Sequence, residues 1–297
     1  MTDTSGERPL RILHVFRAPL GGLFRHVLDV ARGQIERGHA VGIFCDSSTG
    51  GTRADTAFQE LSSQLELGVT RVPMSRYPNL TDARAQLSAL SLLRRLSPDV
   101  VHCHGSKGGV YGRTPALFSP ARSYVTAYTP HGGSFNYKPG TLEHKVYMSV
   151  ERLLERATDM FLFESAFIAG RFEAYIGRPP RSAYRIVLNG VSEAEFEPID
   201  HTDARFDLLY LGELRWAKGV DTLIDALSLL RRGGGPNPPI LIVGSGPDEA
   251  ELRQLVRERG IADQCTFEPP GPIRKALAQA RVMVVPSRAE SLPYVVL

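Results

Sequence analysis

The sequence has few cysteines, no long apolar run and little net charge. Three cysteines occur among 297 residues, far apart and without metal-ligand spacing, so we interpret them as reduced packing residues. No apolar run approaches the roughly 20 residues that a membrane-spanning helix needs. The net charge of +3 gives no reason to expect a nucleic-acid partner, although it tolerates an anionic ligand or a membrane surface.

Two further signals are missing. Residues 1–8 are polar and contain no apolar signal core, so we expect a cytoplasmic protein rather than a secreted one. The dinucleotide fingerprint Gly-x-Gly-x-x-Gly does not occur, which argues against a nicotinamide-dependent oxidoreductase.

What is present is typical of a soluble α/β protein. Hydrophobic residues make up 42% and charged residues 23%, as in ordinary globular chains, and the length allows two domains. Apolar runs alternate with patterns of helical spacing, and this order predicts parallel sheets with right-handed crossovers. Strands are predicted at residues 11–16, 40–45, 69–74, 100–104, 123–129, 160–163, 185–187, 206–211, 239–244, 265–267 and 282–285.

The pattern predicts two doubly wound, Rossmann-like domains. Residues 1–191 hold the first series of strands, and residues 206–297 hold the second. Residues 192–205 are acidic and polar and lack an apolar period, which indicates a linker. The second domain offers roughly four strands where an open nucleotide-binding sheet commonly has about six. Because the chain also ends at Leu297 within an apolar helical pattern, we expect a truncated C-terminal domain.

A basic pair follows the first strand of the second domain. The apolar run ends at Gly212, Arg215 and Lys218 come next, and a helical pattern begins after Gly219. In a parallel sheet such a turn lies at the carboxyl edge, where ligands bind. Two cations beside the N–H groups of a helix start suit a diphosphate. The alternative is a surface loop that happens to carry both residues.

Glycines and histidines stand at similar places in the first domain. Gly21 and Gly22 lie between a strand and a helix, where backbone N–H groups can approach a phosphate, although a tight turn explains them equally well. His131 closes the fifth strand and can donate to a sugar hydroxyl or stabilise developing charge. We interpret His102 as a core residue and leave the role of His104 open.

Two more features lie in the second domain. Gly244 and Gly246 form another strand-to-helix turn, either shaping a nucleotide pocket or making a bare turn. Glu290 is expected just past a strand and at the opening of a helix. Its carboxylate can bind two vicinal hydroxyls there, although a glutamate is also favoured at any helix start.

Taken together, these motifs resemble the family 4 glycosyltransferases, retaining enzymes with two Rossmann domains facing each other across a cleft (GT-B). The resemblance covers nearly everything from Arg11 to Leu297. It depends on Gly21-Gly22, Asp99-Val-Val-His-Cys-His104, Thr129-Pro-His-Gly132, Phe163-Glu-Ser165, Asn189-Gly-Val191, Gly212-x-Leu-x-x-x-Lys-Gly219, Val243-Gly-x-Gly-Pro247 and Glu290-Ser-Leu-Pro293.

The resemblance implies a role for each site. The donor is a nucleotide diphosphate sugar of the UDP or GDP type, and no cofactor or metal is expected. Arg215 and Lys218 would bind the diphosphate, His131 would contact the transferred sugar, and Glu290 would hold its hydroxyls. The remaining donor-side candidates are Gly21, Gly22, Gly244, Gly246, Ser291, Leu292 and Pro293, and the acceptor-side candidates are His104 and Lys107.

The implied reaction moves the sugar to a saccharide or lipid-linked acceptor, in bacterial surface polysaccharide or glycolipid synthesis. A cytoplasmic protein of this kind can contact the inner face of the membrane. The sequence departs from the family pattern at its end, because the second glutamate of Glu-x7-Glu would follow Leu297. Two alternatives stay open, a non-catalytic nucleotide-sugar-binding module and a GT-B-fold epimerase.

Overall fold

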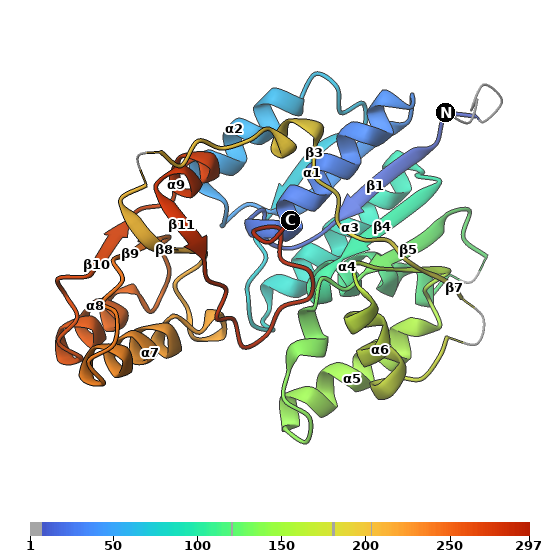
Figure 1. Cartoon of the computed structure of the whole chain (residues 1–297). Coiled ribbons are helices and arrows are strands. Elements are labelled where there is room, and N and C mark those ends of the chain that lie inside the picture. Colours follow the sequence, from blue (N-terminus) through green and yellow to red (C-terminus); the bar gives the residue numbers. More distant parts are fainter. Residues whose placement is uncertain (1–7, 120, 180–181, 203) are drawn as a thin grey trace. The chain divides into compact units, whose positions relative to one another are not determined.

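The computed structural model describes residues 8–297 except 120, 180–181 and 203; the polar start of the sequence lies outside the described residues. The chain divides into two compact units (Figure 1). The first unit runs to Gly190 and includes Ser291–Tyr294. The second comprises Val191–Glu290 and Val295–Leu297.

The first unit is built on a seven-stranded sheet in the order β3-β2-β1-β4-β5-β6-β7. All neighbouring strands pair in parallel. Strand β2 is buried at every residue, as expected for a parallel strand that helices cover on both faces. The strands are β1 (Arg11–Val15), β2 (Ala40–Asp46), β3 (Gly68–Val72), β4 (Val100–His104), β5 (Val125–Thr129), β6 (Met160–Phe163) and β7 (Ala183–Ile186).

Helices connect these strands, as the alternating pattern predicts. Their apolar stripes meet two clusters of buried side chains, one on each side of the central strands. Helix α5 begins where the Thr141 hydroxyl accepts a hydrogen bond from the backbone of His144. The helices are α1 (Gly21–Glu36), α2 (Gly51–Leu61), α3 (Thr81–Leu96), α4 (Gly105–Leu117), η1 (Gly133–Asn136), α5 (Leu142–Glu155) and α6 (Ala166–Tyr175).

The strand order reverses between β1 and β4. From β1 the chain proceeds outward to β2 and β3, and from β4 it proceeds the other way to β7. In open α/β sheets, ligands bind beyond the carboxyl ends of the strands at this reversal. His14 pairs in register with His102 across it. The first unit therefore presents its histidine-rich strands at the place where a ligand is expected.

The second unit repeats this plan on a four-stranded parallel sheet in the order β10-β9-β8-β11. Here the order reverses between β8 and β11, so the loops that follow these two strands share one edge. The elements are η2 (Glu193–Phe196), β8 (Phe206–Leu211), η3 (Trp216–Lys218), α7 (Val220–Arg232), β9 (Ile240–Val243), α8 (Glu249–Glu258), β10 (Cys265–Glu268), α9 (Ile273–Ala278) and β11 (Ala280–Met283).

Two predictions for the end of the chain are wrong. Strand β11 begins two residues before the predicted start, because Ala280 pairs with Phe206 and fixes the register. Glu290 does not open a helix, since residues 290–297 form bends and turns. The hydroxyl of Ser291 and the carbonyl of Leu292 are instead bonded to side chains of the first unit.

The predicted linker groups with the second unit. The ring of His201 lies with Nδ1 3.1 Å from the Ala280 carbonyl oxygen. Arg274 donates from its guanidinium to the carbonyl oxygens of Glu197 and Pro198, at 2.9 and 3.1 Å. These bonds fix residues 197–201 to the second sheet and to α9.

Candidate functional site

Gly244 and Gly246 allow two loops of the second unit to pack closely. A Cβ on Gly244 would lie 1.9 Å from the Gly212 carbonyl oxygen, and a Cβ on Gly246 would lie 2.3 Å from that of Leu214. The loops are also bonded, because Leu214 donates its N–H to the Ser245 carbonyl at 2.9 Å. The glycines therefore position the loop after β8, which carries the predicted basic pair.

Lys218 and Glu290 are brought together by Gly219. This glycine has a φ of +69°, and a Cβ on it would lie 2.1 Å from the Pro286 carbonyl oxygen. The close approach joins the loop after β8 to the segment after β11. Across it the Lys218 ammonium donates to Oε1 of Glu290, which also accepts from the Ser287 hydroxyl at 2.8 Å. Both side chains keep about a quarter of their surface exposed, so a ligand can reach them.

Arg215 lies on the same loop and has a different neighbour. Its Nε is 2.8 Å from a carboxylate oxygen of Glu213. Arg288 is a further cation nearby, and its guanidinium donates to both carboxylate oxygens of Asp221 at 2.7 Å. That bidentate pair, with Arg288 donating its backbone N–H to Ala217, holds η3 in place.

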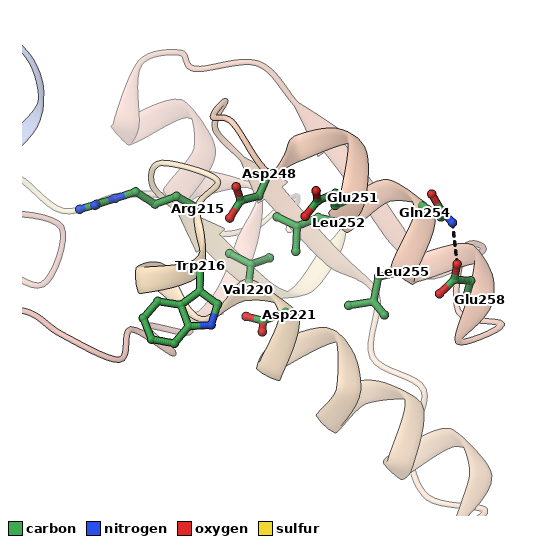
Figure 2. A pocket seen from close by; sticks show the side chains of 10 residues that line it. All are labelled: Arg215, Trp216, Val220, Asp221, Asp248, Glu251, Leu252, Gln254, Leu255 and Glu258. Atoms are coloured by element: carbon green, nitrogen blue, oxygen red, sulfur yellow. Dashed lines mark hydrogen bonds between the residues drawn. The ribbon is translucent and has the colours of Figure 1, made fainter. Parts of the chain in front are cut away.

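A groove of about 370 Å³ lies beside this loop, between η3, α7 and α8 (Figure 2). Asp221, Asp248, Glu251 and Glu258 give its lining several carboxylates. Figure 2 shows the side chain of Arg215 extending away from the others. A diphosphate would be repelled by these carboxylates, so the Lys218 side of the loop, rather than this groove, is the anion site that the charges favour.

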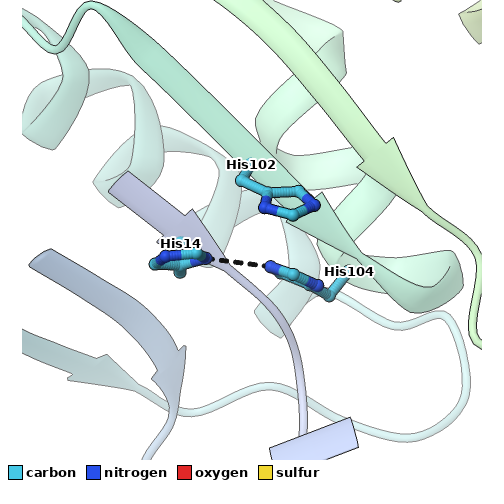
Figure 3. Close-up of side chains that lie close together, drawn as sticks. All are labelled: His14, His102 and His104. Carbon is cyan, nitrogen blue, oxygen red and sulfur yellow. Dashed lines mark hydrogen bonds between the residues drawn. The ribbon is translucent and has the colours of Figure 1, made fainter. Parts of the chain in front are cut away.

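Five histidines of the first unit lie close together. His14, His102, His104 and His131 lie on or just after β1, β4 and β5, and His26 lies on α1. His14, His102 and His104 are buried, and Figure 3 shows their rings side by side. Burial lowers the pKa of His14 to about 4, and it lowers the pKa values of His102 and His104 well below their ordinary range. Ring nitrogens of these three lie within 4.8 Å of one another, as do those of His26, His104 and His131, so either set could hold a metal ion.

His131 ends this group and has an unusual backbone. Its φ is +52°, in the left-handed region that non-glycine residues seldom adopt, and the next two glycines also have positive φ. The carboxylate of Glu164, at the end of β6, accepts a hydrogen bond from the Gly132 N–H at 2.8 Å. A strained turn held in this way is typical of a functional site.

Glu164 lies in the Phe163-Glu-Ser165 motif, but no role was predicted for it from the sequence. Its side chain is buried, and burial raises the pKa of its carboxyl group. One oxygen receives bonds from Gly132 and from the Ser291 hydroxyl, while the buried Oε2 has no partner within the described part of the chain. The signal that could have found it is its place at the carboxyl end of a strand beside β5.

Gly21 and Gly22 lie where the prediction put them, at the start of α1. Gly21 has a φ of +62° and open space beside it, so the turn itself requires glycine there. A Cβ on Gly22 would meet the ring of Tyr294 at 3.1 Å. The Arg25 guanidinium lies 4.5 Å from the centre of that ring. Residues Ser291–Tyr294 thus cover part of the glycine turn.

The two acceptor-side candidates are already engaged. Lys107 forms an ion pair with Asp82 at 2.6 Å and donates to the Tyr77 carbonyl. His104 is fully buried and bonds two other imidazoles, so it can reach a ligand only through His131. His102 is a core residue, as predicted.

A buried ion pair supports the turn after His131. Arg113 and Glu151 meet at 2.7 Å, both almost completely buried. The other carboxylate oxygen of Glu151 accepts from the hydroxyls of Tyr128 and Ser134, each at 2.8 Å. Because Ser134 lies in η1, this network ties the turn to α5 and to β5.

The structure thus gathers the predicted residues in two groups. In the second unit, Lys218 and Glu290 are in contact and Arg215 lies on the same loop. In the first, His131 is joined to His104 and stands beside Glu164 through Gly132. One group offers cations and a carboxylate, and the other offers imidazoles that burial keeps neutral.

Two family models match the chain. The model described as Glycosyltransferase Family 4 matches residues 20–195, and the model described as Glycosyl transferases group 1 matches residues 191–297. The first covers more than half of the chain.

One curated relative is the GDP-mannose-dependent alpha-(1-6)-phosphatidylinositol monomannoside mannosyltransferase of Mycobacterium tuberculosis. It is 31% identical over 163 residues, which are 51% of this chain and 41% of the relative. The chain spans from 41% to 64% of the first curated relatives that it matches.

Solved structures share the fold at low identity. Sucrose-phosphate synthase from Thermosynechococcus elongatus has a TM-score of 0.74 at 19% identity, covering 97% of this chain and 78% of that one. Anabaena HepE in complex with UDP and glucose has a TM-score of 0.69 at 18% identity, covering 95% and 75%. This likeness confirms two parallel-sheet α/β domains of the GT-B fold.

Proposed function

This chain belongs to the family 4 glycosyltransferases, and we propose that it transfers a sugar from a nucleotide diphosphate donor to a hydroxyl of an acceptor. The observation that carries the proposal is the Lys218–Glu290 pair at the reversal of the second sheet. An ammonium there suits a diphosphate, and the adjacent carboxylate suits the hydroxyls of the attached sugar.

In the proposed reaction, charge develops on both the sugar and the leaving diphosphate. As the bond to the anomeric carbon breaks, positive charge develops on the sugar ring and negative charge on the leaving diphosphate. Arg215 and Lys218 stabilise the diphosphate where that charge develops, so the proposal needs no divalent ion. His131 contacts the transferred sugar. The acceptor attacks from the face that the diphosphate leaves, its proton passes to a diphosphate oxygen, and the anomeric configuration is retained.

The backbone turns complete the proposed donor site. Gly21 and Gly22, at the start of a 16-residue helix, present N–H groups that suit a phosphate or a polar acceptor. Ser291, Leu292 and Pro293 follow Glu290 directly in the chain. We propose that these residues contact the donor, and that Gly244 and Gly246 act by positioning the loop that bears Arg215.

We propose a UDP or GDP sugar as donor, because the M. tuberculosis relative is named for GDP-mannose and the HepE structure holds UDP. Thermal unfolding with a panel of nucleotides tests this. A nucleoside diphosphate at 100 times its Kd should add about 2.7 kcal/mol of stability. The matching monophosphate at the same concentration should add less, because it lacks the second phosphate. Equal protection by mono- and diphosphates would contradict the assignment of the basic pair.

An acceptor assay separates transfer from its alternatives. A transferase consumes the nucleotide sugar only when an acceptor hydroxyl is present. An epimerase changes the sugar without an acceptor, and a binding module protects against unfolding without any turnover. Release of nucleoside diphosphate should therefore depend on both substrates.

We further propose that the chain works in the cytoplasm at the inner face of a membrane, on a saccharide or lipid-linked acceptor and without nucleic acid. Among the described residues no helix combines the length and apolar character required to cross a bilayer. Support for membrane contact comes from α5. Leu142, Val146, Val150 and Leu153 are exposed at helical spacing on one stripe, with Lys145 and Arg156 beside it.

The exposed apolar stripe on α5 can be tested by substitution. Replacing Leu142, Val146 and Leu153, which are 75%, 53% and 49% exposed, with serine should reduce sedimentation with vesicles of anionic phospholipid several-fold. Leu229→Ser on α7, where the leucine is 68% exposed, is the matched control and should bind like the unmodified chain. Equal sedimentation of all three proteins would exclude α5 as the contact.

A further inference from the structure

Three imidazoles form a hydrogen-bonded series that begins at Gln34. The Gln34 amide oxygen lies 2.8 Å from Nε2 of His14, and Nδ1 of His14 lies 3.0 Å from Nε2 of His104. Nδ1 of His104 then lies 3.1 Å from Nε2 of His131. Figure 3 shows the middle link. The series thus runs from the half-buried end of α1 through the centre of the sheet to the turn after β5.

In such a series all the hydrogen bonds must run the same way, from donor to acceptor, along the row of rings. A neutral imidazole has one nitrogen that donates and one that accepts, so each link fixes the next. Burial keeps the rings neutral, since it lowers the pKa values of His14, His104 and His131. The Gln34 side chain turns its oxygen, not its NH2 group, toward His14, so it accepts and His14 carries its proton on Nε2. His104 then donates from Nε2 to His14, and His131 donates from Nε2 to His104.

The last nitrogen of the series is available to a ligand. With its proton on Nε2, His131 keeps a lone pair on Nδ1, and no side chain or backbone group in the described part of the chain is bonded to that atom. Gly132 and Glu164 hold the turn that carries the ring. The direction set at Gln34 therefore decides whether His131 offers an acceptor or a donor.

We propose that Gln34 is a positioning residue that acts through His14 and His104 to hold His131 as the Nε2–H tautomer, with Nδ1 accepting a hydrogen bond from a ligand hydroxyl. The tautomer is a property of the free protein. Its consequence for sugar transfer depends on the proposed function.

The same histidines would behave differently around a metal. Zinc binds imidazole nitrogens at about 2.0–2.1 Å and needs a lone pair on each of them. Two nitrogens bound to one zinc ion at that bond length would lie roughly 3.3 Å apart, close to the 3.0 Å between His14 and His104. The difference lies in the proton, because the hydrogen bond needs one between the two nitrogens and the ion would displace it. His102 is likewise bonded through Nε2 to the Thr129 hydroxyl at 2.9 Å. The hydrogen-bonded series accounts for these contacts without an ion.

Three substitutions at Gln34 test the direction. Gln34→Glu can only accept and should keep the wild-type tautomer. Gln34→Lys can only donate, so it should reverse the series and place the proton of His131 on Nδ1. Gln34→Met has no donor and only the weak acceptor of a thioether, so it should leave a mixture. Gln59→Lys, at an exposed position of α2, is the control and should change nothing.

The readout is the pair of ring ¹⁵N signals of His131, assigned with a His131→Gln variant and recorded at pH 7.5. The expected result is Nε2–H in the wild type and Gln34→Glu, and Nδ1–H in Gln34→Lys. The proposal would be overturned if His131 of the wild type carried its proton on Nδ1, or if all the Gln34 variants showed the same tautomer. Stoichiometric zinc by elemental analysis would also overturn it. If Gln34→Lys fails to fold, the comparison of Gln34→Glu with Gln34→Met decides.

Donor-dependent kcat/KM provides a second readout. Gln34→Lys should lose about tenfold relative to Gln34→Glu, because His131 would then present a donor to a hydroxyl that needs an acceptor. A tautomer switch without this loss would leave the series intact and would remove His131 from the proposed donor site. The tautomer proposal and the proposed role of His131 in sugar transfer can therefore fail independently, and the two readouts distinguish the failures.

Discussion

Replacing Lys218 with alanine should lower the donor-dependent rate of sugar transfer by about 10²–10³-fold. The ammonium stands at the carboxyl edge of β8 and touches the carboxylate of Glu290, 72 residues later in the chain. In the proposed reaction its charge acts on the leaving diphosphate most strongly when the bond to the sugar is breaking. The loss should therefore fall on kcat as well as on kcat/KM.

Stability should change little in the same variant. Both members of the pair are partly exposed, so the interaction between them contributes no more than about 1 kcal/mol. Lys275→Ala, which removes an exposed lysine from α9 of the same unit, is the matched control and should keep the wild-type rate within about twofold.

Affinity for the nucleoside diphosphate, measured by calorimetry, gives a result that does not depend on turnover. Lys218→Ala should weaken it about tenfold, and Lys218→Arg should recover part of the loss because it restores the charge without the geometry. An alanine variant with wild-type affinity and rate would show that the diphosphate binds elsewhere.

Local pattern was enough to find most of the elements. The strands β4, β6 and β8 have the bounds predicted for them, because each is a short apolar run between turn residues or polar residues. For β11 the apolar run continues past the strand, so the pattern could not show which part pairs with β8.

Long-range pairing explains what the sequence could not show about the site. Placing Lys218, His131 and Glu290 at strand ends follows from the alternation of strands and helices. The contact between Lys218 and Glu290 also requires β8 to be the neighbour of β11. The bond between His14 and His104, 90 residues apart, likewise requires β1 beside β4. Strand order is a property of the whole sheet, and no local pattern encodes it.

Acidification from pH 7.5 to 5.5 should destabilise the first unit by at least about 4 kcal/mol. His14, His102 and His104 are buried and neutral, and the folded-state pKa of His14 is about 4. In the unfolded chain each has a pKa of about 6.5, so around and below that pH the unfolded state binds more protons than the folded state. At pH 5.5 each of the three therefore costs about 1.4 kcal/mol.

Burial also lowers the pKa values of His26 and His131, so these two imidazoles add to the loss, while the carboxyl groups behave differently. Burial acts to raise the pKa values of Asp46 and Asp82, but their hydrogen bonds outweigh it and lower them. The stability that these carboxylates contribute is therefore lost only below about pH 4, outside the window. Burial raises the pKa of Glu164, so its contribution grows on acidification and opposes the loss. One opposing carboxyl does not cancel three imidazoles.

The position of the single tryptophan makes the measurement specific. Trp216 lies in the second unit, where His201 is the only histidine and is exposed. Denaturant unfolding followed by far-ultraviolet circular dichroism should shift strongly between the two pH values, while the tryptophan fluorescence transition should shift less. His201→Gln should leave both shifts unchanged, and His102→Gln should reduce the proton uptake on unfolding by about one. If the circular dichroism transition at pH 5.5 coincided with that at pH 7.5, the imidazoles would already be charged or solvated in the fold, and the neutral series from Gln34 to His131 could not exist.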